Sequence, residues 1–120
     1  MIDLCVLGPS GRMGQQVCQL ALASNEFQLT SAVARRGSDA IGNGIQGSTV
    51  QIGDSLAKAL GEAQVYIDFT VPASTTHAAV AALAHHTAAV VGTTGLDAEA
   101  QSALDALAKV APVFVAANFS

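Results

Sequence analysis

Short apolar runs alternate along the chain with stretches in which apolar residues recur every three or four positions. Short runs bounded by turn-forming residues are typical of buried strands, and the wider spacing is typical of helices with one buried face. The expected strands are 2–7, 29–34, 49–52, 65–69, 88–91 and 113–116, and the expected helices are 11–24, a short one capped by Asp54 or Ser55, 72–86 and 97–109. This alternation predicts an α/β fold with a doubly wound parallel sheet of the Rossmann type. On the first helix, Met13, Val17, Leu20 and Ala21 are expected to form the buried face.

The composition is that of one compact domain. Of 120 residues, 51% are hydrophobic and 12% charged, which fits a deeply buried core and excludes a disordered chain. Five basic residues against nine acidic ones, with one Tyr and four Phe, give neither the positive surface nor the stacking platforms that nucleic acids need. No signal peptide or membrane-spanning run is present, and Cys5 and Cys18 fit buried thiols in a reducing compartment. We therefore expect a cytoplasmic protein that binds neither nucleic acid nor membrane.

The stretch Gly8–Gly14 joins the first expected strand to the first expected helix and has Gly at its first, fourth and seventh positions. The first Gly allows a turn that a Cβ would obstruct, the second lets the backbone approach a diphosphate, and the third lets the helix pack closely on the sheet. Free N–H groups and the helix dipole would then hold the phosphates. A tight turn alone also favours Gly, but the strand before this one and the helix after it favour a dinucleotide site.

The residues after the second expected strand indicate which dinucleotide binds. An NAD-specific site usually has Asp or Glu there to bind the ribose 2′-hydroxyl, whereas here Ala34 is followed by Arg35 and Arg36. Two guanidinium groups can pair with a 2′-phosphate, and one of them can stack on the adenine. A pair of arginines can also be ordinary solvated loop charges, but the glycine turn upstream favours phosphate recognition. We expect NADPH to be the preferred cofactor, with NADH as the alternative.

Three further segments follow expected strands and so lie at the edge of the sheet where open α/β folds bind ligands. They are Asp-Phe-Thr-Val-Pro at 68–72, Val-Gly-Thr-Thr-Gly at 91–95 and Ala-Ala-Asn-Phe-Ser at 116–120. Together with the glycine turn, their order and spacing over the whole chain resemble the 4-hydroxy-tetrahydrodipicolinate reductase family. This family, long called dihydrodipicolinate reductases, belongs to the diaminopimelate and lysine pathway.

The resemblance implies a set of cofactor-binding residues. The phosphate-binding turn is matched by Gly8, Pro9, Ser10, Gly11, Arg12 and Met13, and the 2′-phosphate contact by Arg35. The segments beside the diphosphate, the nicotinamide and its ribose are matched by Phe69, Thr70, Gly92, Thr93, Thr94, Ala116, Ala117, Asn118 and Phe119. Considered alone, residues 92–95 could be a plain turn and Asn118 a helix cap. Ala34 stands where many members have the ribose-binding acid, which argues against efficient use of NADH.

The resemblance also implies a reaction, in which hydride passes from the nicotinamide to a cyclic hydroxy-acid. In the family, a catalytic His and Lys belong to a His-His-x-x-x-Lys-x-Asp-Ala-Pro-Ser-Gly-Thr type segment of a second domain, and this sequence has no such segment. His85 and His86 have no Lys after them and are expected at an ordinary helix end, as His77 is on a helix surface. We expect no metal site and no catalytic residue here. The chain should be the dinucleotide-binding domain alone, which binds cofactor without turnover.

Other readings of the sequence remain open. A family member holds its small-molecule substrate in the second domain and forms a homo-oligomer, a tetramer by the resemblance. A dinucleotide-sensing module without chemistry, or a different two-domain oxidoreductase, would share the same fold. The segments 92–95 and 117–120 favour a nicotinamide pocket over a sensor that binds only adenine and phosphates.

Overall fold

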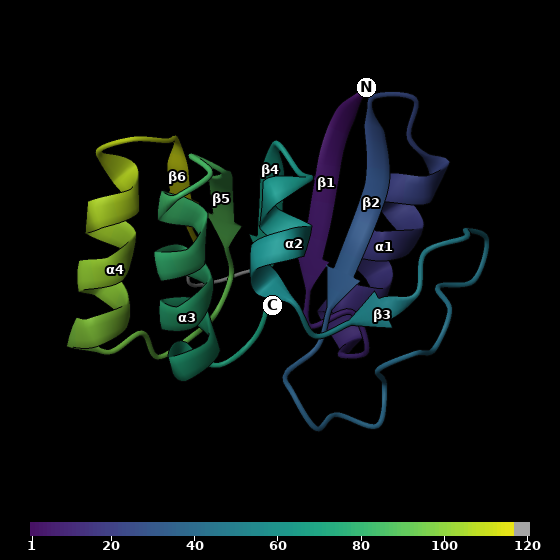
Figure 1. Ribbon diagram of the computed structural model, residues 1–120, viewed down its shortest axis with the longest axis horizontal. Coiled ribbons are helices and arrows are strands. Elements are labelled where there is room, and N and C mark those ends of the chain that lie inside the picture. Colours follow the sequence, from purple (N-terminus) through teal and green to yellow (C-terminus); the bar gives the residue numbers. More distant parts are fainter. Residues whose placement is uncertain (117–120) are drawn as a thin grey trace.

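The computed structural model describes residues 1–116, in which strands and helices alternate along the chain (Figure 1). The elements are β1 (Ile2–Leu7), α1 (Arg12–Ala23), β2 (Phe27–Val33), β3 (Ile52–Gly53), α2 (Leu56–Gly61), β4 (Val65–Asp68), α3 (Pro72–Leu83), β5 (Ala88–Val91), α4 (Ala98–Ala108) and β6 (Val113–Val115). Strands 2–7 and 88–91 have the predicted bounds, and most other elements differ from prediction by one or two residues at an end.

All six strands are parallel and follow the order β3-β2-β1-β4-β5-β6. This order is the doubly wound Rossmann arrangement, so the predicted fold class is confirmed. The chain moves outward from β1 to β3, then crosses back and continues from β4 to β6. The carboxyl ends of β1 and β4 therefore flank the switch point, at which the loops diverge and leave a crevice for a ligand.

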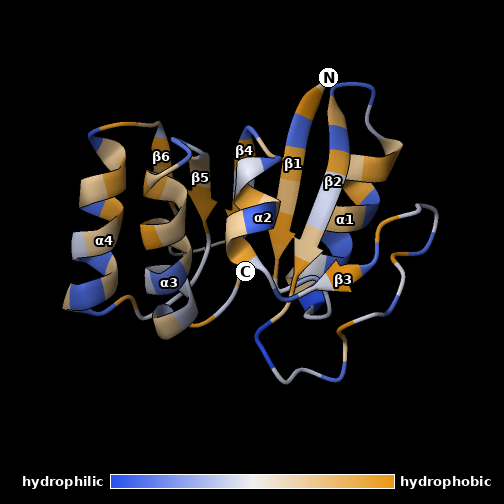
Figure 2. Ribbon diagram, in the orientation of Figure 1, coloured by the Kyte–Doolittle hydropathy of each residue, from blue (hydrophilic) through white to orange (hydrophobic). Residues whose placement is uncertain are grey.

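The helices cover the two faces of the sheet unequally. Figure 1 shows α2, α3 and α4 together on one face and α1 alone on the other. The first face holds a core with Tyr66, Leu104 and Leu107, and the second holds a core with Leu4 and Val6. The hydropathy colouring of Figure 2 places apolar residues along the strands and on the helices. Because α1 packs on β1 and β2, Phe114 of β6 stays 60% exposed within the described part of the chain.

The prediction that Leu20 lies on the buried face of α1 is wrong, because Leu20 is 71% exposed. The buried residues of α1 are Gly14, Cys18 and Ala21, which recur at helical spacing. The buried face of α1 consists of small residues because the helix begins in close contact with Gly8, the first residue of the glycine turn. The bulkier Leu20 lies outside this buried face, on a side of the helix that is open to solvent.

Residues 34–51 are the longest connection between elements in the described chain, and several backbone hydrogen bonds hold them together. The Ile52 N–H donates to the Asn43 carbonyl at 2.8 Å, and the Ile45 N–H donates to the Val50 carbonyl at 2.9 Å. Ile45 is buried in the core beneath α1. The strand expected at 49–52 is therefore displaced, because these residues pair back on their own loop and only Ile52–Gly53 joins the sheet.

Candidate functional site

The turn between β1 and α1 is folded tightly back on itself. Gly8 has a φ of +77°, a left-handed conformation that favours glycine, and its N–H donates to the Val33 carbonyl at 3.0 Å. A Cβ on Gly14 would lie 1.8 Å from the Gly8 carbonyl oxygen, so only glycine fits there. A Cβ on Gly11 would find its nearest neighbour at 3.6 Å, an ordinary contact. The protein's own packing thus explains the first and third glycines of the turn but not the second.

Two of the four helices begin without a side-chain cap among residues 1–116. Ser55 accepts from the Lys58 N–H at 3.3 Å at the start of α2, and Asp97 accepts from the Ala100 N–H at 2.9 Å at the start of α4. By contrast, the N-cap residues of α1 and α3 are Gly11 and Val71, and neither has a side chain that can accept such a hydrogen bond. The first N–H groups of a helix have no partner within it, so α1 and α3 present donors at the edge of the sheet. The sequence prediction left Asp54 and Ser55 as alternative caps for α2, and Ser55 is the cap.

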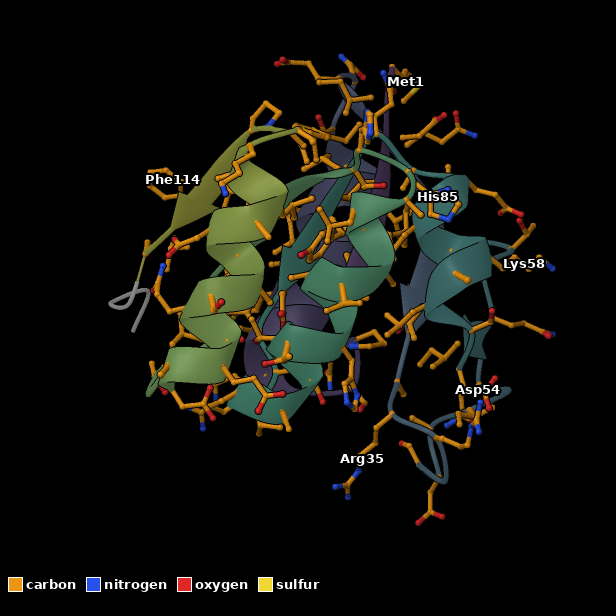
Figure 3. All side chains as sticks on the ribbon, turned by 60° about the vertical axis from the view of Figure 1, so that its left-hand side comes forward. Met1, Arg35, Asp54, Lys58, His85 and Phe114 are labelled. Atoms are coloured by element: carbon orange, nitrogen blue, oxygen red, sulfur yellow. The ribbon has the colours of Figure 1, made fainter. Side chains whose placement is uncertain are left out.

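Arg35 lies between two hollows at the carboxyl edge of the sheet. One hollow of about 390 Å³ is bounded by the end of β2, the start of α2 and the first turns of α3, and includes Arg35 and Thr70. The other, of about 460 Å³, joins Arg35 to Ser10 of the glycine turn. Figure 3 shows Arg35 projecting from the lower edge of the protein, with Asp54 on the neighbouring segment. Both arginines, Arg35 and Arg36, are exposed.

The first hollow also contains residues that the sequence prediction did not assign to the site, namely Asp54, Leu56, Ser74 and His77. His77 is exposed, as expected for a helix surface, but it is on the part of α3 that faces this hollow. The spacing of Ser74 and His77, three residues apart just after a strand and its loop, is the signal that could have placed both on one side of α3.

The loops after β4 and β5 are joined beneath the surface by a fully buried carboxylate. Asp68 is 0% exposed, and its Oδ1 accepts from the Thr70 N–H at 3.0 Å, the Thr70 hydroxyl at 2.5 Å and the Thr93 hydroxyl at 3.2 Å. Thr93 Oγ1 in turn accepts from the Thr75 hydroxyl of α3 at 2.8 Å. Asp68 Oδ2 has no hydrogen-bond partner in the described structure. Burial, together with the charge of Asp68, raises the pKa of Tyr66.

The remaining predicted residues differ in their access to the surface. Ser10, Gly11, Arg12 and Thr94 are exposed, Gly8, Met13, Phe69, Thr70 and Ala116 are half-buried, and Pro9, Gly92 and Thr93 are buried. The Gly92 N–H donates to the Asp68 carbonyl at 2.8 Å, and the Ala116 N–H donates to the Val91 carbonyl at 2.9 Å, which brings these segments to the same edge. The predictions for Ala117, Asn118 and Phe119 lie outside the described residues. The binding roles of all these residues stay predictions.

The two adjacent histidines lie away from this edge. The helix expected to continue through His86 ends at Leu83, and His86 adopts a φ of +54° in the turn that follows. The His85 ring packs against Gly61 of α2, and Figure 3 shows His85 near the opposite edge of the protein from Arg35. Within residues 1–116, no group of three His, Cys, Asp or Glu side chains is placed to hold a metal ion. No helix in this same range has both the length and the apolar character that crossing a bilayer requires.

Comparison with known proteins gives a consistent result. The family model described as dihydrodipicolinate reductase, N-terminus, matches residues 2–119. A 4-hydroxy-tetrahydrodipicolinate reductase of Alkalilimnicola ehrlichii is 37% identical over 123 residues, which cover 98% of this chain and 46% of that protein. The chain therefore spans about half the length of this curated relative.

Two solved structures show the same fold at low sequence identity. A dipicolinate-bound dihydrodipicolinate reductase from Paenisporosarcina sp. TG-14 superposes with a TM-score of 0.80 at 24% identity, over 99% of this chain and 48% of that one. A biliverdin reductase in complex with biliverdin and NADP⁺ from Synechocystis sp. PCC 6803 has a TM-score of 0.77 at 16% identity, over 95% of this chain and 37% of that one.

Proposed function

The chain belongs to the dihydrodipicolinate reductase family, and we propose that it is the NADPH-binding domain of a 4-hydroxy-tetrahydrodipicolinate reductase. The whole protein would reduce 4-hydroxy-tetrahydrodipicolinate to tetrahydrodipicolinate in lysine biosynthesis, with a second domain that holds the substrate and the catalytic His and Lys. Bound NADPH would supply the hydride. Residues 1–120 alone would bind the cofactor without turning over substrate.

The observation that carries the proposal is the hollow shared by the glycine turn and Arg35. The turn lies at the carboxyl end of β1 beside the switch point, where dinucleotides bind in this fold. Gly11 leaves its surface free of a side chain, and the uncapped N–H groups at the start of α1 face the same edge. A diphosphate fits this arrangement, because backbone donors and the positive end of a helix dipole favour an anion.

The residues after β2 support a preference for NADPH over NADH. Ala34 is 8% exposed, and its methyl side chain offers no acceptor to a ribose hydroxyl. Arg35 and Arg36 follow it and are both exposed. A guanidinium can form two parallel hydrogen bonds to a phosphate, so Arg35 would bind the 2′-phosphate that distinguishes NADPH. The hollow on its other side, with Leu56 and His77, would receive the adenosine.

The proposal is tested by titration calorimetry on the 120-residue chain. NADPH should bind more tightly than NADH, and Arg35→Ala should weaken NADPH about tenfold or more, because it removes charge-assisted hydrogen bonds, while leaving NADH nearly unchanged. Lys109→Ala is the matched control, because it removes one positive charge at the far end of α4. Equal affinity for both nucleotides in the unmodified protein would contradict the assignment of Arg35, and binding of neither would contradict the proposed function.

The state of the cysteines supports a reducing, cytoplasmic compartment. Cys5 and Cys18 are both free and both buried in the structure. Thiols of this kind behave as small apolar core residues and do not depend on oxidation for their role.

A further inference from the structure

Asp68 is an unusual residue to find at the end of a central strand. The carboxylate is wholly buried at the carboxyl end of β4, beside the switch point. Burying a charged group is costly, and an apolar side chain of similar size would fill the same space at lower cost. The hydrogen bonds that hold Asp68 come from threonines rather than from a salt bridge. The free-energy cost of burying this carboxyl group indicates a role for Asp68 beyond filling the core.

Several hydrogen-bond donors of the network converge on Asp68 Oδ1. The Thr75 hydroxyl donates to Thr93, the Thr93 hydroxyl donates to Asp68 Oδ1, and Thr70 donates to the same oxygen through both its N–H and its hydroxyl. A carboxyl oxygen accepts hydrogen bonds from N–H and hydroxyl donors, so Oδ1 matches this pattern. Asp68 therefore fastens together the loop after β4, the loop after β5 and the first turn of α3.

The two fastened loops are the ones expected beside the nicotinamide and its ribose. Thr93 is only 2% exposed, so its side chain cannot itself meet a ligand and acts through the position of its loop. Thr70 is half-buried and borders the hollow next to Arg35. Ser10 and Arg35, expected at the diphosphate and the 2′-phosphate, follow β1 and β2, whereas Thr70 and Thr93 follow β4 and β5 across the switch point.

We propose that Asp68 is a positioning residue for the nicotinamide half of the cofactor, acting through Thr70 and Thr93. The inference rests on the proposed function, because it takes NADPH as the ligand. Loss of the network should let the two loops move relative to each other. Affinity for the nicotinamide half should fall, while affinity for the adenosine half should not.

The test compares NADPH with 2′,5′-ADP, which has the adenosine and 2′-phosphate but no nicotinamide. Calorimetry on the 120-residue chain should show that the unmodified protein binds NADPH more tightly than 2′,5′-ADP. Thr93→Val keeps the size of the side chain but removes its hydroxyl, and Asp68→Ala removes the acceptor. Each should weaken NADPH about tenfold, as expected for a few lost hydrogen bonds, and leave 2′,5′-ADP within about twofold. The change in nicotinamide fluorescence on binding should shrink in both variants.

Asp68→Asn is the conservative variant. Its amide oxygen can take the place of Oδ1 and accept the same threonine donors, so it should restore most of the NADPH affinity. Thr87→Val is the matched control, because the Thr87 hydroxyl is also buried and donates to the Leu60 carbonyl at 2.9 Å, but it precedes β5 at the other edge of the sheet. This variant should lower stability and leave both affinities unchanged.

The outcomes separate the two proposals. Failure of the unmodified chain to bind either ligand would contradict the proposed function itself. If the unmodified chain binds both ligands equally, or if Thr93→Val changes the two affinities by the same factor or leaves both unchanged, the role of Asp68 is overturned. Should Asp68→Ala fail to fold, Thr93→Val decides alone.

Discussion

At the scale of single residues, Gly14 is the position where one added carbon has the largest expected effect. Its Cβ would lie 1.8 Å from the Gly8 carbonyl oxygen and 3.0 Å from the Pro9 Cα, and backbone atoms of a tight turn cannot yield as a flexible side chain does. Gly14→Ala should therefore lower the free energy of unfolding by roughly 3 kcal/mol or more, as severe overpacking does. Urea denaturation followed by circular dichroism measures this loss.

Gly11→Ala is the matched substitution, and it should separate binding from folding. Gly11 has a φ of −74°, and its Cβ would have no neighbour closer than 3.6 Å, so alanine fits the conformation and the space. The cost to stability should be about 1 kcal/mol or less, since alanine replaces glycine at an N-cap. The added methyl group should nevertheless weaken NADPH binding, because it occupies the surface that the diphosphate would approach. A Gly11→Ala chain with unchanged NADPH affinity would show that the diphosphate binds elsewhere.

At the scale of elements, Asp97 illustrates how a cap supports the core. Its side chain accepts from the Ala100 N–H at the start of α4, the helix that buries Leu104 and Leu107. Asp97→Ala should lower the free energy of unfolding by about 1 kcal/mol, the usual cost of a lost N-cap. Gln101→Ala, which removes an exposed hydrogen bond to Asp105 on the same helix, should change stability by less than about 0.5 kcal/mol. Equal losses in the two variants, measured by thermal or urea unfolding, would contradict the special role of the cap.

Most elements could be predicted from the sequence because their signals are local. Apolar runs such as 88–91 and caps such as Asp97 depend on neighbouring residues only. The displaced β3 and the exposed Leu20 were mispredicted because tertiary contacts decided them. Val50 and Gln51 pair with their own loop, and close packing against Gly8 favours a face of small residues on α1.

In the candidate site, too, some residues could be located from local sequence signals, and others only from tertiary contacts. That the glycine turn, Arg35 and Thr70 lie at one edge of the sheet was predictable, because each follows a strand and the parallel topology brings strand ends together. Ser74 and His77 were not assigned, since only the packing of α3 against the edge brings them to the hollow. Asp68 belonged to a segment that the sequence singled out. That it is fully buried and joins two loops depends on contacts between residues far apart in the chain.

At the scale of the whole molecule, the sheet joins two cores that must unfold together. Cys5 lies in β1, which is hydrogen-bonded to β2 on one side and β4 on the other. Its side chain is 0% exposed and belongs to the core under α2, α3 and α4. The thiol can therefore reach water only when the sheet opens, and its ionisation reports on global stability.

The pH dependence of unfolding tests this directly. Burial raises the pKa of Cys5 from 9.0 to about 11, so above pH 9 the unfolded chain loses the thiol proton while the folded chain keeps it. The unfolded state then binds fewer protons, and the free energy of unfolding falls as pH rises between these two values. At pH 10.5 the contribution lost should be about 2 kcal/mol, which Cys5→Ala would not lose. Urea unfolding under reducing conditions should therefore show that the stability advantage of the unmodified protein over Cys5→Ala is constant from pH 6 to 8 and shrinks at pH 10.5. An advantage that stays constant to pH 10.5 would mean that the Cys5 thiol meets water in the folded protein, and that β1 is not held as the centre of one cooperative sheet.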